Sequence, residues 1–171
     1  LASINETNDG LGFSIMDIIL KRSIEWLDRL IAFDTTSRLS NLDLISDIEQ
    51  YMNELGVPTR LTHDKDKTKA NLWCTIGPQD IGGVVLSGHT DVVPIDGQEW
   101  TKTPFKMSEQ SGKLFGRGTS DMKGFCAIAL AMAPEMKSRD LKVPIHFAFS
   151  FDEEVGCVGV RHLIKDVVDN L

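Results

Sequence analysis

The sequence predicts an α/β fold with helices on both faces of one sheet. Stretches with helical spacing of apolar residues alternate along the chain with short β-rich runs, which is the pattern of α/β domains. One of these runs, residues 84–86, is apolar without interruption, as in a strand that is covered on both faces. The 171 residues, 42% of them hydrophobic, supply enough apolar material for one core and too little for two domains.

Two helices are expected at the start of the chain. The first covers residues 16–33, where apolar residues recur at helical spacing, and the turn-forming residues 34–37 end it. The second covers residues 41–55, with Gly56 as its C-terminal cap and Pro58 preventing continuation. Their apolar faces consist of Leu20, Ile24, Leu27, Ile31, Leu44, Ile45, Ile48, Met52 and Leu55.

Strands and further helices follow. The β-rich runs predict four strands, at residues 59–62, 71–76, 84–87 and 143–151. The helical patterns predict two more helices, at residues 123–137 and 158–168. Pro134 leaves the last turn of the first of these undecided, since a late proline kinks or ends a helix. Residues 89–120 show little periodicity, and so long a stretch inside a compact domain is usually functional.

Composition and charge argue against several classes of partner. With 18 Lys and Arg against 25 Asp and Glu, the net charge is −7, so the chain lacks the basic footprint that nucleic acids and anionic membranes require. No apolar run reaches the length of a transmembrane helix. The three cysteines are widely spaced, so we expect no disulfide framework and a reducing, cytoplasmic location.

Residues 1–15 are set apart from the fold. Leu1 is not a start residue, and the helical pattern begins near Met16. Residues 1–10 contain Glu6 and Asp9 but no Lys or Arg, which argues against the basic start of a signal peptide. We therefore expect residues 1–15 to be a leader or an artificial extension, and residues 16–171 to form the folded part.

Candidate chemistry follows two of the predicted strands, because ligands of open α/β sheets bind beyond the carboxyl ends of the strands. His89 and Asp91 come directly after the strand at residues 84–87. A neutral imidazole is a good zinc ligand, and a nearby carboxylate such as Asp91 can orient the ring. For this pair alone, a hydrogen-bonded His in a polar loop is an equally good interpretation.

Three consecutive acids, Asp152, Glu153 and Glu154, come directly after the strand at residues 143–151. Their charges repel one another unless a cation or solvent screens them. Because adjacent side chains point in different directions, one carboxylate can bind metal while its neighbour faces a reacting water. The alternative is an acidic helix N-terminus, where the helix dipole favours negative charge, and for this segment alone that alternative is the better one.

Asp121 is the third candidate, at the start of the helix at residues 123–137. Its segment, residues 116–124, fits neither a dinucleotide-binding fingerprint nor a nucleophile elbow. The alternative role for Asp121 is to cap the helix. Taken together, one His and several carboxylates from three segments converge on one rim of the sheet, and such a set suits zinc, cobalt or manganese.

The three segments resemble signature blocks of the M20 family of two-zinc metallopeptidases and deacylases, in the family's order and spacing. They read Ser87-Gly88-His89-Thr90-Asp91-Val92-Val93-Pro94, Gly116-Arg117-Gly118-x-x-Asp121-Met122-Lys123-Gly124 and Asp152-Glu153-Glu154-Val155-Gly156. The resemblance implies a truncated three-layer αβα fold of the zinc-hydrolase kind, with residues 16–171 as the N-terminal part of the catalytic domain. Within the family, residues 94–98 and 156–159, with Trp100 and Phe105, are most similar to acetylornithine deacetylases.

The resemblance also implies roles for five residues. His89 would bind one zinc ion, Glu154 the other and Asp121 both, with cobalt as a substitute for zinc. Asp91 would hold the His89 ring. Glu153 would be the general base that takes a proton from water and passes it to the leaving amine. The implied reaction is removal of the acetyl group from N-acetyl-L-ornithine, a small N-acyl amino acid, in arginine biosynthesis.

The resemblance implies further features of the backbone and of the whole protein. Family members have a cis peptide bond at the position of Asp121–Met122. A further acidic ligand, a second His and a lid or dimerisation domain come later in family members than Leu171. We therefore expect the parent enzyme to be a homodimer and the 171-residue chain alone to bind metal weakly, to be inactive and to self-associate through an exposed sheet edge and apolar helix faces.

Alternatives remain for the function and for other residues. Within the family, the chain could belong to a succinyl-diaminopimelate desuccinylase or to another aminoacylase or peptidase. From a different class, a truncated relative that only binds is possible, although a binding protein has no use for the base Glu153. We expect His146 to lie on a sheet face, His63 to be exposed, and Cys126 and Cys157 to be buried packing residues.

Overall fold

The computed structural model describes residues 14–170 and the side chains of residues 14–168. Residues 1–13, and with them most of the expected leader, lie outside the described residues. Helix α1 (Ile15–Ile31) begins after Ser14, which exchanges hydrogen bonds with Asp17 in a capping box. Ser14 and Ile15 therefore belong to this helix. Across residues 14–170, none of the helices combines the length and the apolar character that crossing a membrane requires.

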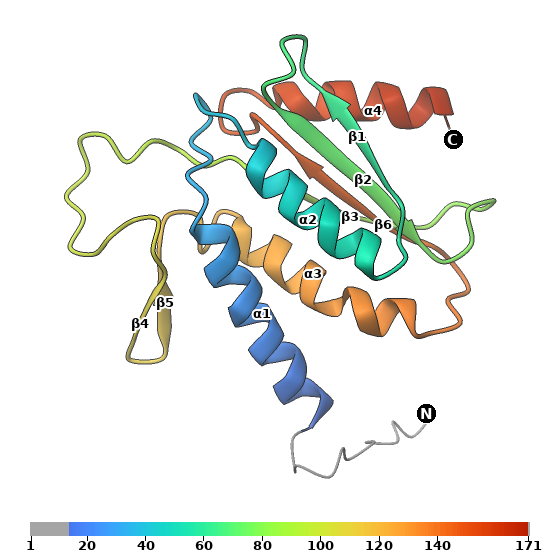
Figure 1. Ribbon diagram of the computed structural model, residues 1–171, viewed down its shortest axis with the longest axis horizontal. Coiled ribbons are helices and arrows are strands. Elements are labelled where there is room, and N and C mark those ends of the chain that lie inside the picture. The colour runs from blue at the N-terminus through green and yellow to red at the C-terminus, as the bar shows by residue number, and fades with distance from the viewer. Residues whose placement is uncertain (1–13, 171) are drawn as a thin grey trace.

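One four-stranded sheet forms the centre of the fold, in the order β1-β2-β6-β3 (Figure 1). The strands are β1 (Thr59–His63), β2 (Ala70–Ile76), β3 (Val84–His89) and β6 (Ile145–Ser150). β2 runs antiparallel to both β1 and β6, whereas β3 and β6 are parallel, with His89 paired to Ser150. Because β3 and β6 end at the same edge of the sheet, the segments that follow them emerge side by side.

Helices cover both faces of this sheet, which confirms the predicted α/β layering. α2 (Leu42–Glu54) and α3 (Lys123–Lys137) cross the near face in Figure 1, and α4 (Val158–Asn170) lies behind the sheet. Successive side chains of β2 point to opposite faces of the sheet, so this strand contacts helices on both faces. Leu72 and Cys74 are buried in the core under α2 and α3, whereas Asn71 donates its side-chain amide to the carbonyl of Gly159 in α4.

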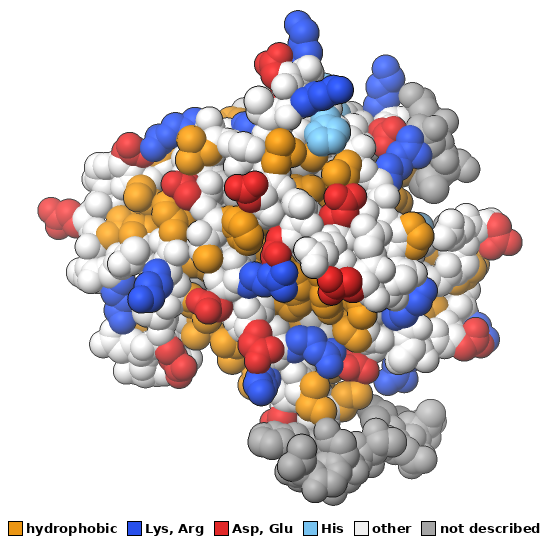
Figure 2. Space-filling model, viewed as in Figure 1, with side chains coloured by type: hydrophobic (Ala, Val, Ile, Leu, Met, Phe, Trp, Pro, Cys, Tyr) orange, Lys and Arg blue, Asp and Glu red, His pale blue; other side chains and the backbone are white. Residues whose placement is uncertain are grey.

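The core lies mainly between the sheet and the three helices α1, α2 and α3. Helix α1 packs on α3, beside the sheet rather than over it. The fully buried large apolar side chains of this core are Leu30, Ile31, Leu44, Ile45, Ile48, Met52, Leu72, Leu130, Phe147 and Phe149. On the face shown in Figure 2, acidic and basic side chains are interspersed among the described residues, without a basic patch.

The expectation that residues 84–86 form a strand covered on both faces is wrong for this structure. β3 is an edge strand, and Val84 and Val85 are 53% and 48% exposed. Within residues 14–170, no further strand pairs with its free edge. Only the last two residues of β3, Gly88 and His89, are buried.

A short hairpin lies inside residues 89–120, where the sequence predicted no regular structure. It consists of β4 (Ser108–Gln110) and β5 (Lys113–Phe115). Ser111 and Gly112 between them both have positive φ, 53° and 71°, as in a type I′ hairpin turn. The strands are too short for an alternating pattern to stand out, but the Ser-Gly pair was a turn signal.

Pro134 does not end α3, which continues to Lys137. A proline in a helix leaves the carbonyl four residues earlier without its N–H partner. Here that carbonyl belongs to Leu130, and it accepts a hydrogen bond from the Tyr51 hydroxyl of α2 at 3.1 Å. The other predicted elements agree with the structure to within about two residues at each end, which is the usual precision of helix boundaries.

Candidate metal centre

His89, the last residue of β3, is held at both ring nitrogens. Nδ1 lies 2.9 Å from the carbonyl oxygen of Asp91, and Nε2 lies 3.0 Å from Oδ1 of Asp121. Because a carbonyl only accepts, Nδ1 carries the hydrogen of this contact, and the lone pair of a neutral ring is then on Nε2. The nitrogen that could bind a metal therefore faces the carboxylates.

Gly88, the residue before His89, lets helix α3 approach the end of β3 closely. A side-chain carbon at this position would lie 2.8 Å from Sγ of Cys126 and 3.2 Å from the ring of Phe125. Both of these residues belong to α3. The start of α3, which carries Asp121 just before it, is therefore held next to His89.

Asp91 is buried and serves as the anchor of the acidic turn that follows β6. Its carboxylate accepts hydrogen bonds from the backbone N–H of Glu153 at 3.0 Å and of Glu154 at 3.2 Å, and from the hydroxyl of Ser37 at 2.7 Å. Burial acts to raise the pKa of Asp91, but hydrogen bonds from His89, Ser37 and these two amides outweigh burial and lower it. Oδ1 of Asp91 also lies 3.5 Å from Nδ1 of His89.

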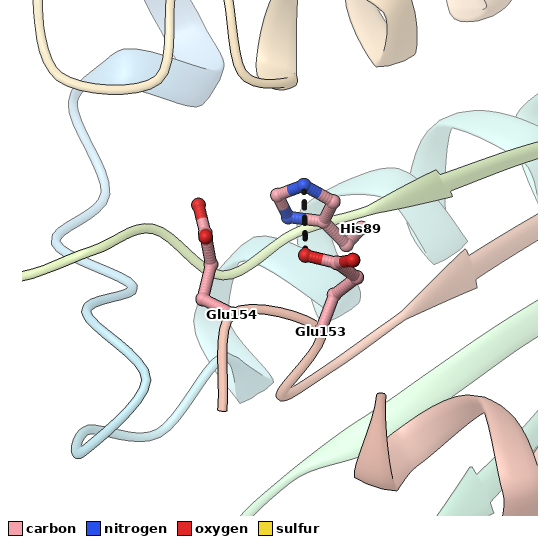
Figure 3. A group of neighbouring side chains, drawn as sticks. All are labelled: His89, Glu153 and Glu154. Carbon is pink, nitrogen blue, oxygen red and sulfur yellow. Dashed lines mark ion pairs between the residues drawn. The ribbon is translucent and has the colours of Figure 1, made fainter. Parts of the chain in front are cut away.

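Glu153 and Glu154 bring their carboxylates to the His89 ring. Figure 3 shows the carboxylate of Glu153 directly below the ring and Glu154 beside it. Oε2 of Glu153 lies 3.6 Å from Nε2 of His89. One ligand atom from each of the three residues lies within 4.8 Å of the others, which is close enough for one ion to contact all three.

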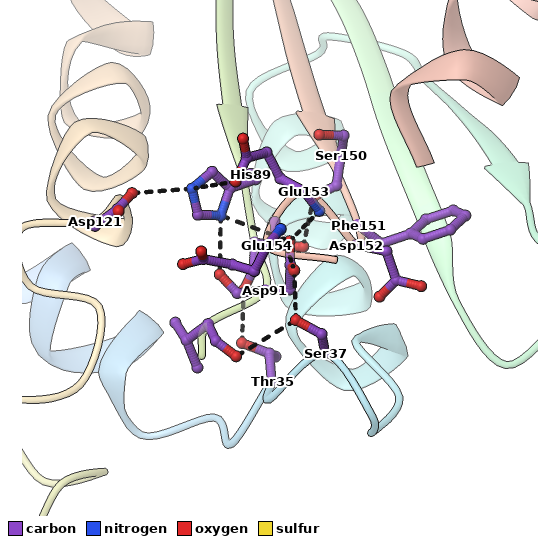
Figure 4. Close-up of polar contacts among 12 residues, drawn as sticks. Thr35, Ser37, His89, Asp91, Asp121, Ser150, Phe151, Asp152, Glu153 and Glu154 are labelled. Atoms are coloured by element: carbon purple, nitrogen blue, oxygen red, sulfur yellow. Dashed lines mark hydrogen bonds and ion pairs between the residues drawn. The ribbon is translucent and has the colours of Figure 1, made fainter. Parts of the chain in front are cut away.

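Asp121 reaches the same point from the turn before α3, as Figure 4 shows. Its side chain is 76% exposed, and its only hydrogen bond among the described residues is the one to His89. The interpretation of Asp121 as a helix cap is wrong, because Met122 is at the N-cap position and the helix has no side-chain cap. The peptide bond between Asp121 and Met122 is cis, as the family resemblance implied.

The acidic residues 152–154 do not start a helix either. α4 begins at Val158 and has no acidic residue in its first turn, so stabilisation by the helix dipole does not explain these charges. Figure 4 shows that Asp152 points away from His89, to the opposite side of the turn from Glu153 and Glu154. The structure therefore separates Asp152 from the other two acids.

The centre attracts positive charge. Burial acts to lower the pKa of His89, but the hydrogen bonds and charges of Asp91 and Asp121 outweigh burial and raise it to about 9. The pKa of Glu154 is also raised, first by burial and then by repulsion from Asp121. A divalent cation would relieve both effects, because it would replace the proton on Nε2 and neutralise the facing carboxylates. One imidazole nitrogen and several carboxylate oxygens are a donor set that fits zinc, cobalt or manganese.

Sequence reasoning missed a backbone segment, residues 35–37, that supports this centre. Residues 35–37, interpreted only as a turn, run beside residues 90–92 and form a bridge between Thr36 and Val92. The hydroxyl of Thr35 donates to the carbonyl of Thr90 at 2.6 Å (Figure 4). The run Thr35-Thr36-Ser37 after a helix was the signal, since hydroxyl side chains next to a predicted site can hold its backbone.

Lys123 is a second residue that sequence reasoning missed. Its side chain is 1% exposed, and its ammonium group donates to the carbonyls of Leu30 at 2.9 Å and Phe33 at 2.8 Å, at the end of α1. Burial lowers its pKa to about 8. Lys123 therefore fastens the turn that carries Asp121 to the end of α1.

Comparison with known proteins decides the family. Residues 85–171, half of the chain, match peptidase family M20/M25/M40. The chain belongs to this family. It is also 39% identical over 127 residues to an acetylornithine deacetylase of Shigella sonnei (strain Ss046), an alignment that covers 74% of this chain and 33% of that protein. The chain thus spans about a third of the length of this relative.

Solved structures of M20 proteins share the fold. The metallo-carboxypeptidase Sso-CP2 of Sulfolobus solfataricus matches 87% of this chain and 35% of its own, with a TM-score of 0.76 and 21% identity. A dinuclear metal-binding peptidase of Bacillus subtilis matches 89% of this chain and 40% of its own, with a TM-score of 0.60 and 23% identity. At this level of identity the two structures support the fold alone.

The other histidines and cysteines are not among the residues that face Nε2 of His89, although Cys157 borders the centre, with Sγ 3.6 Å from Oε1 of Glu153. His146 is buried on the sheet face, as expected, with Nδ1 2.9 Å from the hydroxyl of Thr75 and its ring stacked on Trp73. His63 is exposed, as expected. Cys126 is buried, but the expectation that Cys157 is buried is wrong, because it lies in the exposed turn between the acids and α4.

Proposed function

We propose that the protein to which this chain belongs is a metal-dependent amide hydrolase that removes the acetyl group from N-acetyl-L-ornithine, in arginine biosynthesis. The observation that carries the proposal is the meeting of His89, Asp121, Glu153 and Glu154 at the end of β3 and β6. Membership of the M20 family supports the reaction class, and the 39% identity to an acetylornithine deacetylase supports the substrate.

In this proposal His89, Asp121 and Glu154 hold the metal, two zinc ions in a complete site, with cobalt as a substitute. A bound divalent cation supplies polarisation of the amide carbonyl and a lowered pKa of water. Asp91 keeps the acidic turn and His89 in place. The small N-acyl amino acid is the partner of the site, and the whole protein is a cytoplasmic homodimer.

Glu153 handles the protons of the reaction. Its side chain is 43% exposed, and its carboxylate faces the His89 ring, with Oε2 3.6 Å from Nε2 (Figure 3). Water adds through its oxygen to the acyl carbon while a proton passes to the Glu153 carboxylate. The bond between the acyl carbon and the nitrogen then breaks, and Glu153 returns the proton to the leaving amine. The products are acetate and free ornithine.

Metal binding by the chain is the first test. Titration calorimetry with zinc should detect binding to the 171-residue chain, and His89→Ala should weaken it at least about tenfold because a ligand is lost. Glu109→Gln, which removes an exposed carboxylate on β4, is the matched control and should bind as the unmodified chain does. Because the chain alone is expected to bind metal weakly, absence of zinc and cobalt binding both in the unmodified chain and in the protein that contains it would overturn the proposal.

Catalysis by the parent protein is the second test. The zinc-loaded protein that contains this chain should hydrolyse N-acetyl-L-ornithine faster than N-succinyl-diaminopimelate. Glu153→Gln should lower kcat by about 10²–10⁴-fold with an unchanged zinc content. A preference for the succinyl substrate would contradict the substrate assignment, and loss of zinc in Glu153→Gln would show that Glu153 is a ligand rather than the base. No hydrolysis of any N-acyl amino acid would favour a binding protein.

A further inference from the structure

Lys69, the residue before β2, joins two segments that lie on either side of Asp91. Its ammonium group is 2.5 Å from Oδ1 of Asp152 and also donates to the carbonyl oxygen of Ser37. The side chains of Lys69 and Asp152 are only 14% and 16% exposed. This ion pair is therefore much better shielded from water than an ordinary surface pair.

Both segments that Lys69 joins hold the carboxylate of Asp91. The hydroxyl of Ser37 donates to it from one side, and the backbone N–H groups of Glu153 and Glu154 donate to it from the other. Asp152 directly precedes these two glutamates. By joining Asp152 to the carbonyl of Ser37, Lys69 therefore fixes the start of the acidic turn relative to Ser37. Both the turn and Ser37 donate hydrogen bonds to the same Asp91 carboxylate.

The backbone of Asp152 shows why the turn needs such a fixing point. Asp152 has a positive φ of 53°, a conformation that residues other than glycine seldom adopt. The side chain of Asp152 is also shielded from water, so its charge needs a cationic partner. Without Lys69, the carboxylate of Asp152 would turn towards solvent, and the start of the acidic turn would lose this fixing point.

Two further contacts place the start of β2 under the same turn. The side-chain oxygen of Asn71 accepts the backbone N–H of Phe151 at 3.1 Å, and its amide donates to the carbonyl of Gly159 at 2.9 Å. Lys69 and Asn71 thus hold the first two residues of the segment between β6 and α4, and Asn71 also holds the first turn of α4. Of these contacts, only the one from Lys69 also reaches the Ser37 segment.

We propose that Lys69 is a positioning residue of the candidate metal centre. Its ammonium group holds the Asp152–Glu154 turn against the Ser37 segment, so that the amides of Glu153 and Glu154 meet Asp91 and their side chains face His89. Lys69 touches neither His89 nor the carboxylates that face it, and acts only through Asp152 and Ser37. The effect of Lys69 on metal binding rests on the proposed function, but its effect on the position of the turn can be tested without metal.

The first arm of the test measures the turn itself in the metal-free chain. Amide hydrogen exchange of Glu153 and Glu154, followed by NMR, should become about tenfold faster in Lys69→Met, because the turn that carries these amides is no longer held against Asp91. Lys69→Arg keeps the charge and should restore most of the protection. Lys65→Met removes an exposed lysine from the same loop and should leave both amides unchanged.

The second arm measures the consequence for the centre. Zinc affinity should fall about tenfold in Lys69→Met, as for other residues that orient ligands from outside the metal shell, and remain unchanged in Lys65→Met. The visible absorption spectrum of bound cobalt should change with it, which a general loss of stability would not cause. If Lys69→Met does not fold, Lys69→Gln, which removes the charge but keeps a polar side chain, takes its place.

The outcomes separate the two proposals. Unchanged exchange of the Glu153 and Glu154 amides in Lys69→Met overturns the positioning role, whatever its melting temperature. Faster exchange with unchanged zinc affinity and cobalt spectrum also overturns it, because the turn then moves without affecting the centre. If neither the unmodified chain nor the protein that contains it binds metal, the proposed function fails, and the exchange of the two amides alone decides whether Lys69 holds the turn.

Discussion

Single side chains of the candidate centre owe their charge to their neighbours. Asp91 is buried yet favours the charged form, because N–H and O–H donors surround its carboxylate. His89 is buried yet favours the protonated form, because Asp91 and Asp121 face it. The surrounding carboxylates thus favour positive charge at Nε2 of His89, and in the metal-free chain a proton supplies this charge.

The three cysteines should differ sharply in reactivity. Burial raises the pKa of both Cys74 and Cys126 to about 12, so neither should react with a thiol reagent in the folded chain. Cys157 is exposed, and we expect a colorimetric disulfide reagent to titrate one thiol in the folded chain and three in denaturant. Cys157→Ser should abolish the reaction of the folded chain. Two or three reactive thiols before unfolding would contradict the burial of Cys74 and Cys126.

The pH dependence of the modification rate of Cys157 should also reflect the groups that surround this thiol. Desolvation and the nearby carboxylate of Glu153, whose Oε1 lies 3.6 Å from Sγ, raise the pKa of this thiol above its usual 9.0. Because only the thiolate attacks, the rate in the folded chain should still be rising above pH 9, where a free thiol levels off. Glu153→Gln removes the charge and should shift the profile to lower pH; an unchanged profile would contradict this cause.

Among the elements, helix α3 depends on a contact with α2 at the place where Pro134 interrupts its hydrogen bonds. Tyr51→Phe leaves the carbonyl of Leu130 without a donor and should lower the free energy of unfolding by about 1 kcal/mol. Pro134→Ala supplies a backbone N–H for the same carbonyl, so in this background Tyr51→Phe should cost clearly less. Chemical denaturation of the four proteins gives this double-mutant cycle. Equal costs in the two backgrounds would show that Tyr51 does not substitute for the missing N–H.

The helices and strands could be predicted because each has its own periodicity. The range of α3 was predicted, although Pro134 left its last turn undecided, because an apolar segment of this length is typical of a helix. The exposure of β3 could not be predicted, because an apolar run such as residues 84–86 is the same in a central strand and at an edge, and pairing depends on distant residues. The hairpin β4–β5 was missed because three-residue strands carry too little pattern.

At the scale of the whole molecule, the sequence could identify the acids and His89 but not what holds them. Their meeting place follows from parallel strands that end at one edge, which the alternation of elements predicts. The supporting contacts of Ser37, Lys69 and Lys123 join residues 54, 83 and 93 positions apart. Contacts between residues so far apart produce no recognisable spacing pattern in the sequence, and only the folded chain shows them.

Two apolar features border α3 and should make the chain self-associate. One is the free edge of β3, where Val84 and Val85 are about half exposed and unpaired backbone groups can add a strand. The other is a groove of about 530 Å³ between α1, β5 and α3. Its most exposed apolar side chains are Met16, Leu20, Ile24 and Ile128. Apolar surface of this kind tends to be covered by another protein surface.

Sedimentation velocity over a wide range of protein concentration measures this association. The unmodified chain should form dimers or larger species that increase with concentration. Val85→Lys places a charge on the free edge and Leu20→Lys places one in the groove, and each should shift the distribution towards monomer. Val168→Lys adds the same charge to an exposed position of α4 on the far side of the sheet and should have no effect. A monomer at every concentration would show that neither feature drives association, and an equal shift in all three variants would indicate net charge as the cause.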